Sequence, residues 1–181
     1  MEYAGKGGRV DPENVDVVDV QVRFLSDLGR IPEAMELLAG ASKEGVLPRS
    51  LEGRRGWLLM EACQPVEAIE VMTKLSSREP DYGWVQRQLA EWLSERKDWK
   101  ELEGVAKRLT RLMPNDSAAW GYLADASMNL ENKTQAREAF AKAYGLDPHY
   151  PFAGRNLLDF QIEEKAYEEA ARTLETLEHY T

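Results

Sequence analysis

The stretch WGYLADASMNLENKTQAREAFAKAYGLDP, residues 120–148, decides the fold. In its first half, apolar and small residues recur at spacings of three and four: Trp120, Leu123, Ala124 and Ser127. After Glu131-Asn132 the same spacing resumes with Ala136, Ala139, Phe140 and Ala143. This is the period of an amphipathic α-helix, so the stretch predicts two helices joined by a short turn. Pro148 then ends the second helix, because proline lacks an N–H and clashes with the preceding turn.

This helix pair recurs along the chain without a gap. One column of equivalent positions, each 34 residues after the last, holds Ala34, Ala68, Leu102, Ala136 and Ala170. A second column holds Val46, Pro80, Pro114 and Pro148. A fixed period of this length is typical of solenoids, in which each unit packs only on its neighbours. We therefore predict an all-α solenoid with a flexible lead-in at 1–14 and an array over 15–181, divided into repeats 15–48, 49–82, 83–116, 117–150 and 151–181.

Local signals agree with helix pairs. Two acidic or amide pairs have the spacing of capping boxes at the start of second helices: Asp98 with Glu101, and Asn132 with Gln135. Pro32 and Pro151 suit first turns, where a missing N–H costs nothing. Cys63, the one cysteine, lies in a turn and is expected to be a small buried apolar residue rather than a reactive thiol.

Small residues share columns in both helices of the pair. The first helices carry Gly56, Ala90 and Ala124, and the second helices carry Ala34, Ala68, Ala136 and Ala170. Small side chains at these positions let the two helices approach closely. A neighbouring column, Leu89, Leu123 and Leu157, is expected to fill the space beside them. Gln21 and Arg55 occupy this leucine column in the first two units, which therefore fit the pattern less well.

The repeat resembles the tetratricopeptide repeat (TPR). Its most typical residues at that family's spacings are Trp120, Leu123, Ala136, Phe140, Ala143 and Pro148. The resemblance extends over roughly residues 15–181. It implies a right-handed superhelical solenoid of about five helix-turn-helix repeats, with the first helices lining a concave groove. The resemblance indicates fold far more specifically than function, because the fold hosts many unrelated partners.

The groove positions implied by the resemblance define a candidate partner-binding surface for an extended peptide or a helix. These positions hold Arg54, Trp57, Trp84, Arg87, Gln88, Glu91, Tyr122, Asp125, Asn129, Phe152, Arg155, Asn156 and Asp159. Aromatic and arginine side chains are frequent binding anchors, and Asn and Gln can hydrogen-bond a peptide backbone. The alternative for Trp57 and Trp84 is packing between helices.

Some TPR proteins grip the carboxylate tails of chaperones with a Lys/Asn/Asn/Lys/Arg clamp over three repeats. In the first three units, the matching positions hold Asp19, Arg23, Arg54, Trp84 and Gln88. The later windows also lack the clamp residues. We therefore expect a protein-interaction scaffold without carboxylate-clamp specificity.

Composition narrows the partners. The formal net charge is −9, which disfavours nucleic acid and anionic membrane surfaces. No apolar run approaches the roughly 18 residues of a membrane span. With a single cysteine and no signal-peptide pattern, a cytoplasmic protein is expected.

Nothing in the sequence forms a catalytic or metal-binding constellation. His149 and His179 read as surface histidines, and Glu163-Glu164 and Glu168-Glu169 as a solvated helical face. We expect no enzyme activity, no cofactor and no metal.

Two alternatives to a self-standing scaffold stay open. One is a regulatory or targeting TPR domain of a larger enzyme or assembly whose catalytic part lies elsewhere. The other is self-association through an uncapped C-terminal end, where partial exposure is expected for Leu174, Leu177 and Tyr180.

Overall fold

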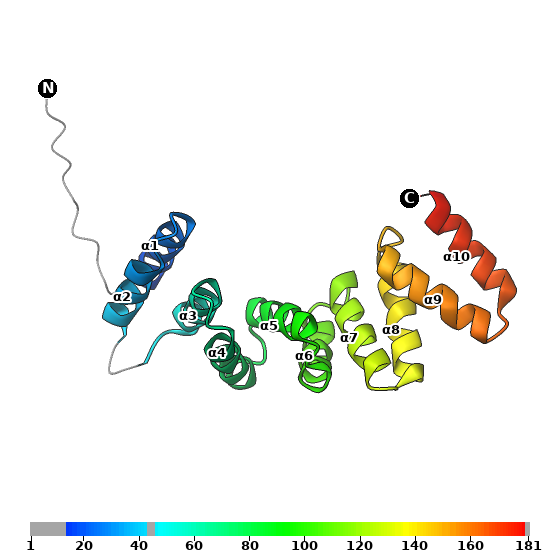
Figure 1. Ribbon diagram of the computed structural model, residues 1–181, viewed down its shortest axis with the longest axis horizontal. Helices are drawn as coiled ribbons and strands as arrows, with labels where there is room; N and C mark the ends of the chain where they lie inside the picture. The colour runs from blue at the N-terminus through cyan, green and yellow to red at the C-terminus, as the bar shows by residue number, and fades with distance from the viewer. Residues whose placement is uncertain (1–13, 43–45, 180–181) are drawn as a thin grey trace, which may run out of the picture. The chain divides into compact units, whose positions relative to one another are not determined.

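The computed structural model describes residues 14–42 and 46–179, and these residues form ten α-helices arranged as five consecutive pairs (Figure 1). The pairs are α1 (Val15–Asp27) with α2 (Ile31–Ala41), α3 (Arg49–Glu61) with α4 (Pro65–Arg78), α5 (Gly83–Arg96) with α6 (Trp99–Leu112), α7 (Ser117–Asn129) with α8 (Lys133–Leu146), and α9 (Pro151–Glu163) with α10 (Tyr167–His179). The all-α helix-turn-helix architecture expected from the sequence is confirmed. Of the expected lead-in, only Asn14 lies within the described residues.

The chain divides into two compact units, each with its own core. Unit 1, Met1–Glu79, holds α1 to α4, and unit 2, Pro80–Thr181, holds α5 to α10. In unit 1 the core gathers Val18, Val22, Ala34, Leu38, Leu51 and Leu58. In unit 2 the largest fully buried side chain is Phe140, which lies among the small residues of α7, α8 and α9. The division into five repeats stays a prediction.

Small residues allow the close helix packing that the sequence predicts. Ala34, Ala68, Ala136 and Ala170 are all buried, as are Gly56, Ala90 and Ala124. The leucines of the neighbouring column, Leu89, Leu123 and Leu157, are buried with them. Arg55, in the same column, is exposed, and Gln21 is half-buried. The second helix pair, α3 with α4, therefore lacks the apolar contact that leucine provides at this position in later pairs.

Each turn within a helix pair contains one residue in the left-handed conformation. These residues are spaced 34 apart: Gly29 (φ 71°), Cys63 (φ 58°), Lys97 (φ 62°), Glu131 (φ 60°) and Lys165 (φ 60°). The expectation that Cys63 is buried is wrong, because its side chain is exposed. The turn requires a left-handed residue at this point, and that residue lies at the helix C-terminal end, outside the packed faces.

The predicted caps are confirmed at one site and absent at the other. The Asn132 side chain accepts a hydrogen bond from the Gln135 backbone N–H at 3.3 Å and so caps α8. Asp98 precedes α6 but makes no side-chain cap, so that prediction is wrong. The Asp98 carboxylate instead pairs with the Arg96 Nε at 3.0 Å. Pro32 and Pro151 do occupy the first turns of α2 and α9.

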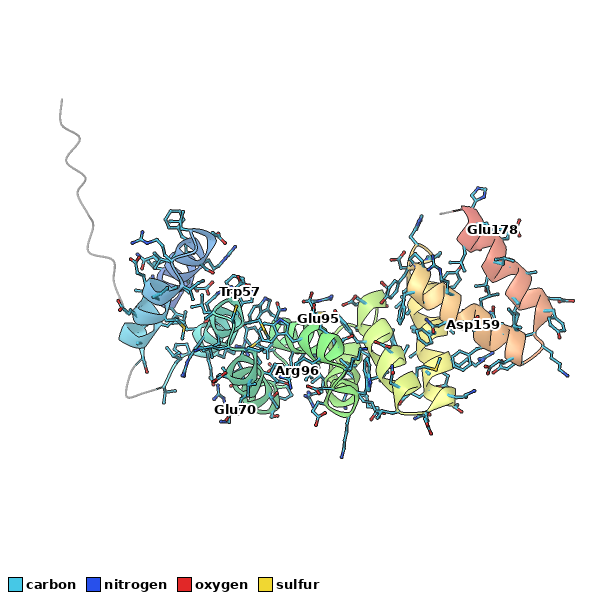
Figure 2. The ribbon with its side chains drawn as sticks, in the orientation of Figure 1. Trp57, Glu70, Glu95, Arg96, Asp159 and Glu178 are labelled. Atoms are coloured by element: carbon cyan, nitrogen blue, oxygen red, sulfur yellow. The ribbon has the colours of Figure 1, made fainter. Side chains whose placement is uncertain are left out.

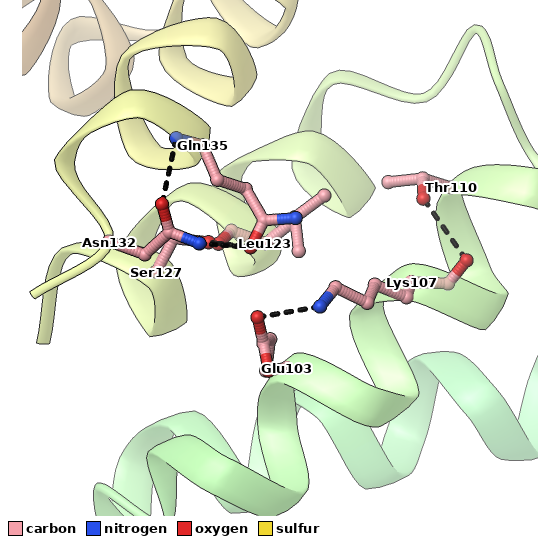
Figure 3. A network of polar contacts seen from close by, with 7 residues as sticks. All are labelled: Glu103, Lys107, Thr110, Leu123, Ser127, Asn132 and Gln135. Atoms are coloured by element: carbon pink, nitrogen blue, oxygen red, sulfur yellow. Dashed lines mark hydrogen bonds and ion pairs between the residues drawn. The ribbon is translucent and has the colours of Figure 1, made fainter. Parts of the chain in front are cut away.

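A polar network surrounds the turn between α7 and α8 (Figure 3). The buried Ser127 hydroxyl lies 2.6 Å from the Leu123 carbonyl oxygen and 3.1 Å from the Gln135 Oε1. The Asn132 side-chain amide donates to the same Gln135 oxygen at 3.3 Å. A buried hydroxyl without a partner would cost roughly 1–3 kcal/mol. The network therefore satisfies Ser127 and fixes the turn.

At the last helix, α10, the expected exposure is only partly correct. Leu174 is exposed, but Leu177 is buried and lies against Gly154 of α9. Tyr180 lies outside the described residues. The absence of a Cβ at Gly154 leaves the room that the Leu177 side chain occupies, because a Cβ there would lie 2.7 Å from the Leu177 Cδ2.

Candidate functional site

The predicted binding residues all lie on first helices of their pairs. Arg54 and Trp57 lie on α3 in unit 1, and the others lie on α5, α7 and α9 in unit 2. Trp57 on α3 and Asp159 on α9 are labelled in Figure 2. Every predicted residue is half-buried or exposed. Each side chain therefore reaches the surface of its own unit, so the two groups are described separately.

In unit 1, Arg54 is held in place by Asp19 of α1. The Arg54 Nε donates to the Asp19 Oδ1 at 2.9 Å and its Nη2 donates to the Oδ2 at 3.3 Å, a two-pronged pair. The guanidinium also lies 5.7 Å from the ring centre of Trp57. Trp57 in turn packs partly against the core of unit 1. These contacts agree with the packing interpretation of Trp57, and a role in binding stays a prediction.

In unit 2, Arg87 on α5 pairs with Asp116, the residue that precedes α7. The other Asp116 oxygen, Oδ1, accepts a hydrogen bond from the Ala118 N–H at 3.1 Å and so caps the helix. The guanidinium Nη2 is also 3.5 Å from the Met113 sulfur. These contacts fix the position of Arg87, so its charge is largely offset by Asp116.

Two tyrosines lie beside this ion pair. Tyr122 on α7 is half-buried, and burial together with the Glu91 carboxylate raises the pKa of its hydroxyl. Tyr150, which precedes α9, lies against Gly121, where a Cβ would be 2.5 Å from the tyrosine oxygen. Burial, Asp125 and Asp116 raise the pKa of Tyr150. Both phenols therefore stay protonated near neutral pH and can donate hydrogen bonds.

Asp125 on α7 is a half-buried acidic group close to Tyr150. Burial raises its pKa above the ordinary value, while hydrogen bonds from Ser94 and Asn129 oppose that shift. The Ser94 hydroxyl is 3.5 Å from the Asp125 Oδ2, and the Asn129 amide donates to the Oδ1 at 3.1 Å. Two such donors offset only part of the desolvation cost. A cation that approached Asp125 would offset more of it.

The other predicted residues of unit 2 lie on α5 and α9. Glu91 accepts a hydrogen bond from the Gln88 side chain at 2.9 Å. Phe152 packs on Phe140 and Tyr150, with ring centres 5.5 and 6.0 Å away, and Trp84 lies 6.0 Å from Tyr82. The Asn156 amide donates to the Phe152 carbonyl oxygen at 2.8 Å. Arg155 and Asp159 are exposed.

Sequence reasoning missed three members of this cluster: Ser94, Asp116 and Tyr150. Asp116 and Tyr150 belong to one column of the repeat, the residue immediately before each first helix. The column does carry a usable signal, because a side chain at a helix entry lies beside the first helix of the preceding pair. Ser94 offered no such pattern.

The arrangement can recognise charge and hydrogen-bonding groups. His149 and His179 are both exposed. Among residues 14–42 and 46–179, no three His, Cys, Asp or Glu side chains are grouped to hold a metal ion.

Acidic groups outnumber Arg87 around the two tyrosines, so this face of unit 2 suits a basic or apolar segment of a ligand.

Comparison with solved structures assigns the fold to the TPR type. A double mutant of MamA from strain RS-1 superposes with a TM-score of 0.76 at 18% identity, over 96% of each chain. MamA from Desulfovibrio magneticus RS-1, residue 41 to the end, gives 0.74 at 18% identity over 96% of this chain and 97% of that chain. PilF of Pseudomonas aeruginosa gives 0.69 at 18% identity, over 92% and 76%. These TM-scores establish a shared helical-repeat fold, and at 18% identity the likeness shows the fold alone.

No family model matches the sequence, and no curated protein matches it. No helix in the described part of the chain is long and apolar enough to cross a membrane.

Proposed function

We propose that this protein is a protein-interaction scaffold that binds another protein, as an extended peptide or helix, on the face formed by α5, α7 and α9 of unit 2. The observation that carries the proposal is the environment of Asp125. It is a half-buried carboxylate with a raised pKa that accepts hydrogen bonds from Ser94 and Asn129 and lies close to Tyr150. A carboxylate held partly out of water gains more from a cationic partner than a fully solvated one does.

The ligand segment would therefore carry lysine or arginine next to apolar residues. Tyr122 and the exposed part of Phe152 supply apolar surface, and Asn129 and Asn156 lie on the same two helices, α7 and α9. The Lys/Asn/Asn/Lys/Arg set that grips chaperone tails is missing at the corresponding positions. We infer a role in recognition rather than catalysis, in the cytoplasm, where the exposed Cys63 thiol would stay reduced.

The test is quantitative capture of partners from native extract on the immobilised full chain. We expect Asp159→Lys and Tyr122→Ala to reduce capture of the same partner by tenfold or more, as hot-spot changes of about 1.4 kcal/mol or larger do. Arg87 is left intact, because its replacement would also remove the Asp116 ion pair that joins α5 to α7.

Glu175→Lys is the matched control, because Glu175 is an exposed acid on α10 of the same unit. It changes net charge as Asp159→Lys does and should leave capture unchanged. Equal loss in both variants would indicate a general charge effect. Capture unaffected by Tyr122→Ala and Asp159→Lys would refute the proposed face.

A further inference from the structure

A second surface, of different character, lies on the first helix pair of unit 1. Between α1 and α2 the chain forms an open groove of about 630 Å³. Its lining is Val20, Gln21, Phe24, Leu25, Glu33, Glu36 and Leu37. Val20 and Phe24 are each 62% exposed, although both are large apolar residues. An apolar groove with an acidic rim is a common form of protein-binding site.

The repeat period shows what kind of position Phe24 occupies. Its equivalents in the other four pairs are Leu58, Trp92, Ala126 and Phe160. Their exposed fractions are 0, 6, 0 and 6%, against 62% for Phe24. The position is therefore a core position wherever a further helix covers it. Only on α1, within the described residues, is its side chain left open.

Unit 2 shows how such a position is covered. Phe160 of α9 lies against α8, with its ring centre 6.4 Å from that of Phe140. Phe140 is itself fully buried. The helix that covers Phe160 thus supplies an aromatic side chain. A helix of the same design would cover Phe24 and fill the groove on α1.

Charge indicates the rest of the partner's chemistry. On α8, Lys133 reaches Glu163 of α9 at 3.4 Å and Arg137 reaches Glu164 at 2.8 Å. The equivalent of Glu163 on α1 is Asp27, which is exposed. Glu36 on the groove rim is a further exposed acid. A helix placed as α8 is would therefore meet carboxylates in unit 1 as well.

We propose that the groove between α1 and α2 binds an amphipathic helix of another protein, with an aromatic residue on its apolar face and basic residues beside it. The helix takes the position on α1 that α8 takes on α9. This site is separate from the face proposed for α5, α7 and α9, and its test does not depend on that face.

A second copy of this chain fits the groove less well. The helix available for such stacking is α10, whose Leu174 is the exposed equivalent of Phe140. That helix carries four glutamates: Glu168, Glu169, Glu175 and Glu178. At the positions equivalent to Lys133 and Arg137, α10 has Tyr167 and Ala171, so it offers no cation at the positions that would face Asp27.

The test uses a peptide copied from α8, because α8 already has the required pattern. The probe is the fluorescent, acetylated and amidated peptide Asn132–Leu146, NKTQAREAFAKAYGL. Its binding to the full chain is measured by fluorescence anisotropy. We expect saturable binding that Phe24→Ala weakens at least roughly tenfold, because a buried aromatic contact is lost. Asp27→Lys and Glu36→Lys should each weaken it about threefold or more at low salt.

Two matched controls keep the outcome interpretable. Val66→Ala removes an apolar side chain that is 65% exposed on α4, and Glu67→Lys reverses an exposed acid there. Both should bind the probe as the unaltered chain does. Because Phe24 is an exposed side chain, its replacement should leave the thermal melt of the chain unchanged.

Three results would overturn the proposal. One is probe binding that Phe24→Ala does not weaken, which would place the site elsewhere. Another is equal affinity for a probe in which Lys133, Arg137 and Lys142 are glutamate. The third is sedimentation showing a dimer of the unaltered chain that Phe24→Ala dissociates, which would make the groove a contact between copies.

Discussion

Arg87 of α5 forms an ion pair with Asp116, the residue that precedes α7 and caps that helix. One carboxylate oxygen faces the guanidinium and the other accepts the Ala118 N–H. The pair therefore links two first helices of unit 2 at the edge of the proposed binding face. Its two functions can be separated by mutation.

Asp116→Ala removes the cap and the ion pair together, and Asp116→Asn removes only the charge. We expect the alanine variant to lower the free energy of unfolding by about 1–2 kcal/mol, mostly through the lost cap. The asparagine variant should cost less, about 0.2–1 kcal/mol, because the pair is partly exposed to solvent. Urea unfolding followed by circular dichroism measures both. Equal losses would mean that the ion pair, not the cap, carries the stability.

Because each turn needs a left-handed residue, a glycine should stabilise the chain in the turn column and destabilise it inside a helix. Lys97 has φ 62°, which costs a side-chain-bearing residue roughly 1–2 kcal/mol. We therefore expect Lys97→Gly to raise the free energy of unfolding by about 0.5–1 kcal/mol, and Gly29→Ala (φ 71°) to lower it by about 1 kcal/mol. Lys100→Gly, inside α6, is the control and should cost about 1 kcal/mol. A destabilised Lys97→Gly would contradict the strain argument.

Two helical glycines should respond to alanine in opposite directions. A Cβ on Gly56 would lie 2.7 Å from the Cγ and 2.8 Å from the sulfur of Met72, which is fully buried. We expect Gly56→Ala to destabilise the chain, because overpacking costs roughly 1–3 kcal/mol. A Cβ on Gly104 meets no atom within 4 Å, so Gly104→Ala should stabilise by about 0.5–1 kcal/mol. Thermal melts that move in the same direction would contradict the packing geometry.

The sequence was sufficient for the helices and their buried columns, because both follow from a strict period. Every first helix begins where the 34-residue spacing predicts, and the small-residue columns are buried. A period carries this information because the same packing problem recurs in each pair. The period did not predict the Asp98 contact, because its carboxylate could either cap α6 or pair with Arg96, and it pairs with Arg96.

The candidate site was harder to predict because it depends on which partner each side chain finds. Arg54 and Arg87 were correctly placed on first helices, but the sequence did not show that Asp19 and Asp116 would neutralise them. The repeat places the residue before each first helix beside the preceding first helix, but residue types at equivalent positions differ, so it did not predict these ion pairs. The exposure of Phe24 was missed for a related reason: a period predicts burial only where a neighbouring helix exists.

Asp125 provides the sharpest prediction, because its effects on stability and binding should oppose each other. Its pKa is raised above the ordinary 3.8 by burial, so the folded state binds a proton more tightly than the unfolded state. The cost of the buried charge is therefore fully present above the folded-state pKa and disappears as pH falls toward the unfolded value. Asp125→Asn should raise the melting temperature at pH 7, and this gain should shrink as pH falls through the folded pKa.

The same replacement should weaken capture of a basic ligand, because asparagine loses the charge but can still accept from Asn129 through its oxygen and donate to the Ser94 hydroxyl through its nitrogen. Melting curves from pH 7 down to 3, with capture assays at pH 7, measure both effects on one variant. Asp147→Asn, an acid in the turn after α8, is the control for a general loss of negative charge. If Asp125→Asn lowered the melting temperature at neutral pH, its two hydrogen bonds would outweigh burial. If Asp125→Asn left capture unchanged, the partner's cation would lie elsewhere on the face.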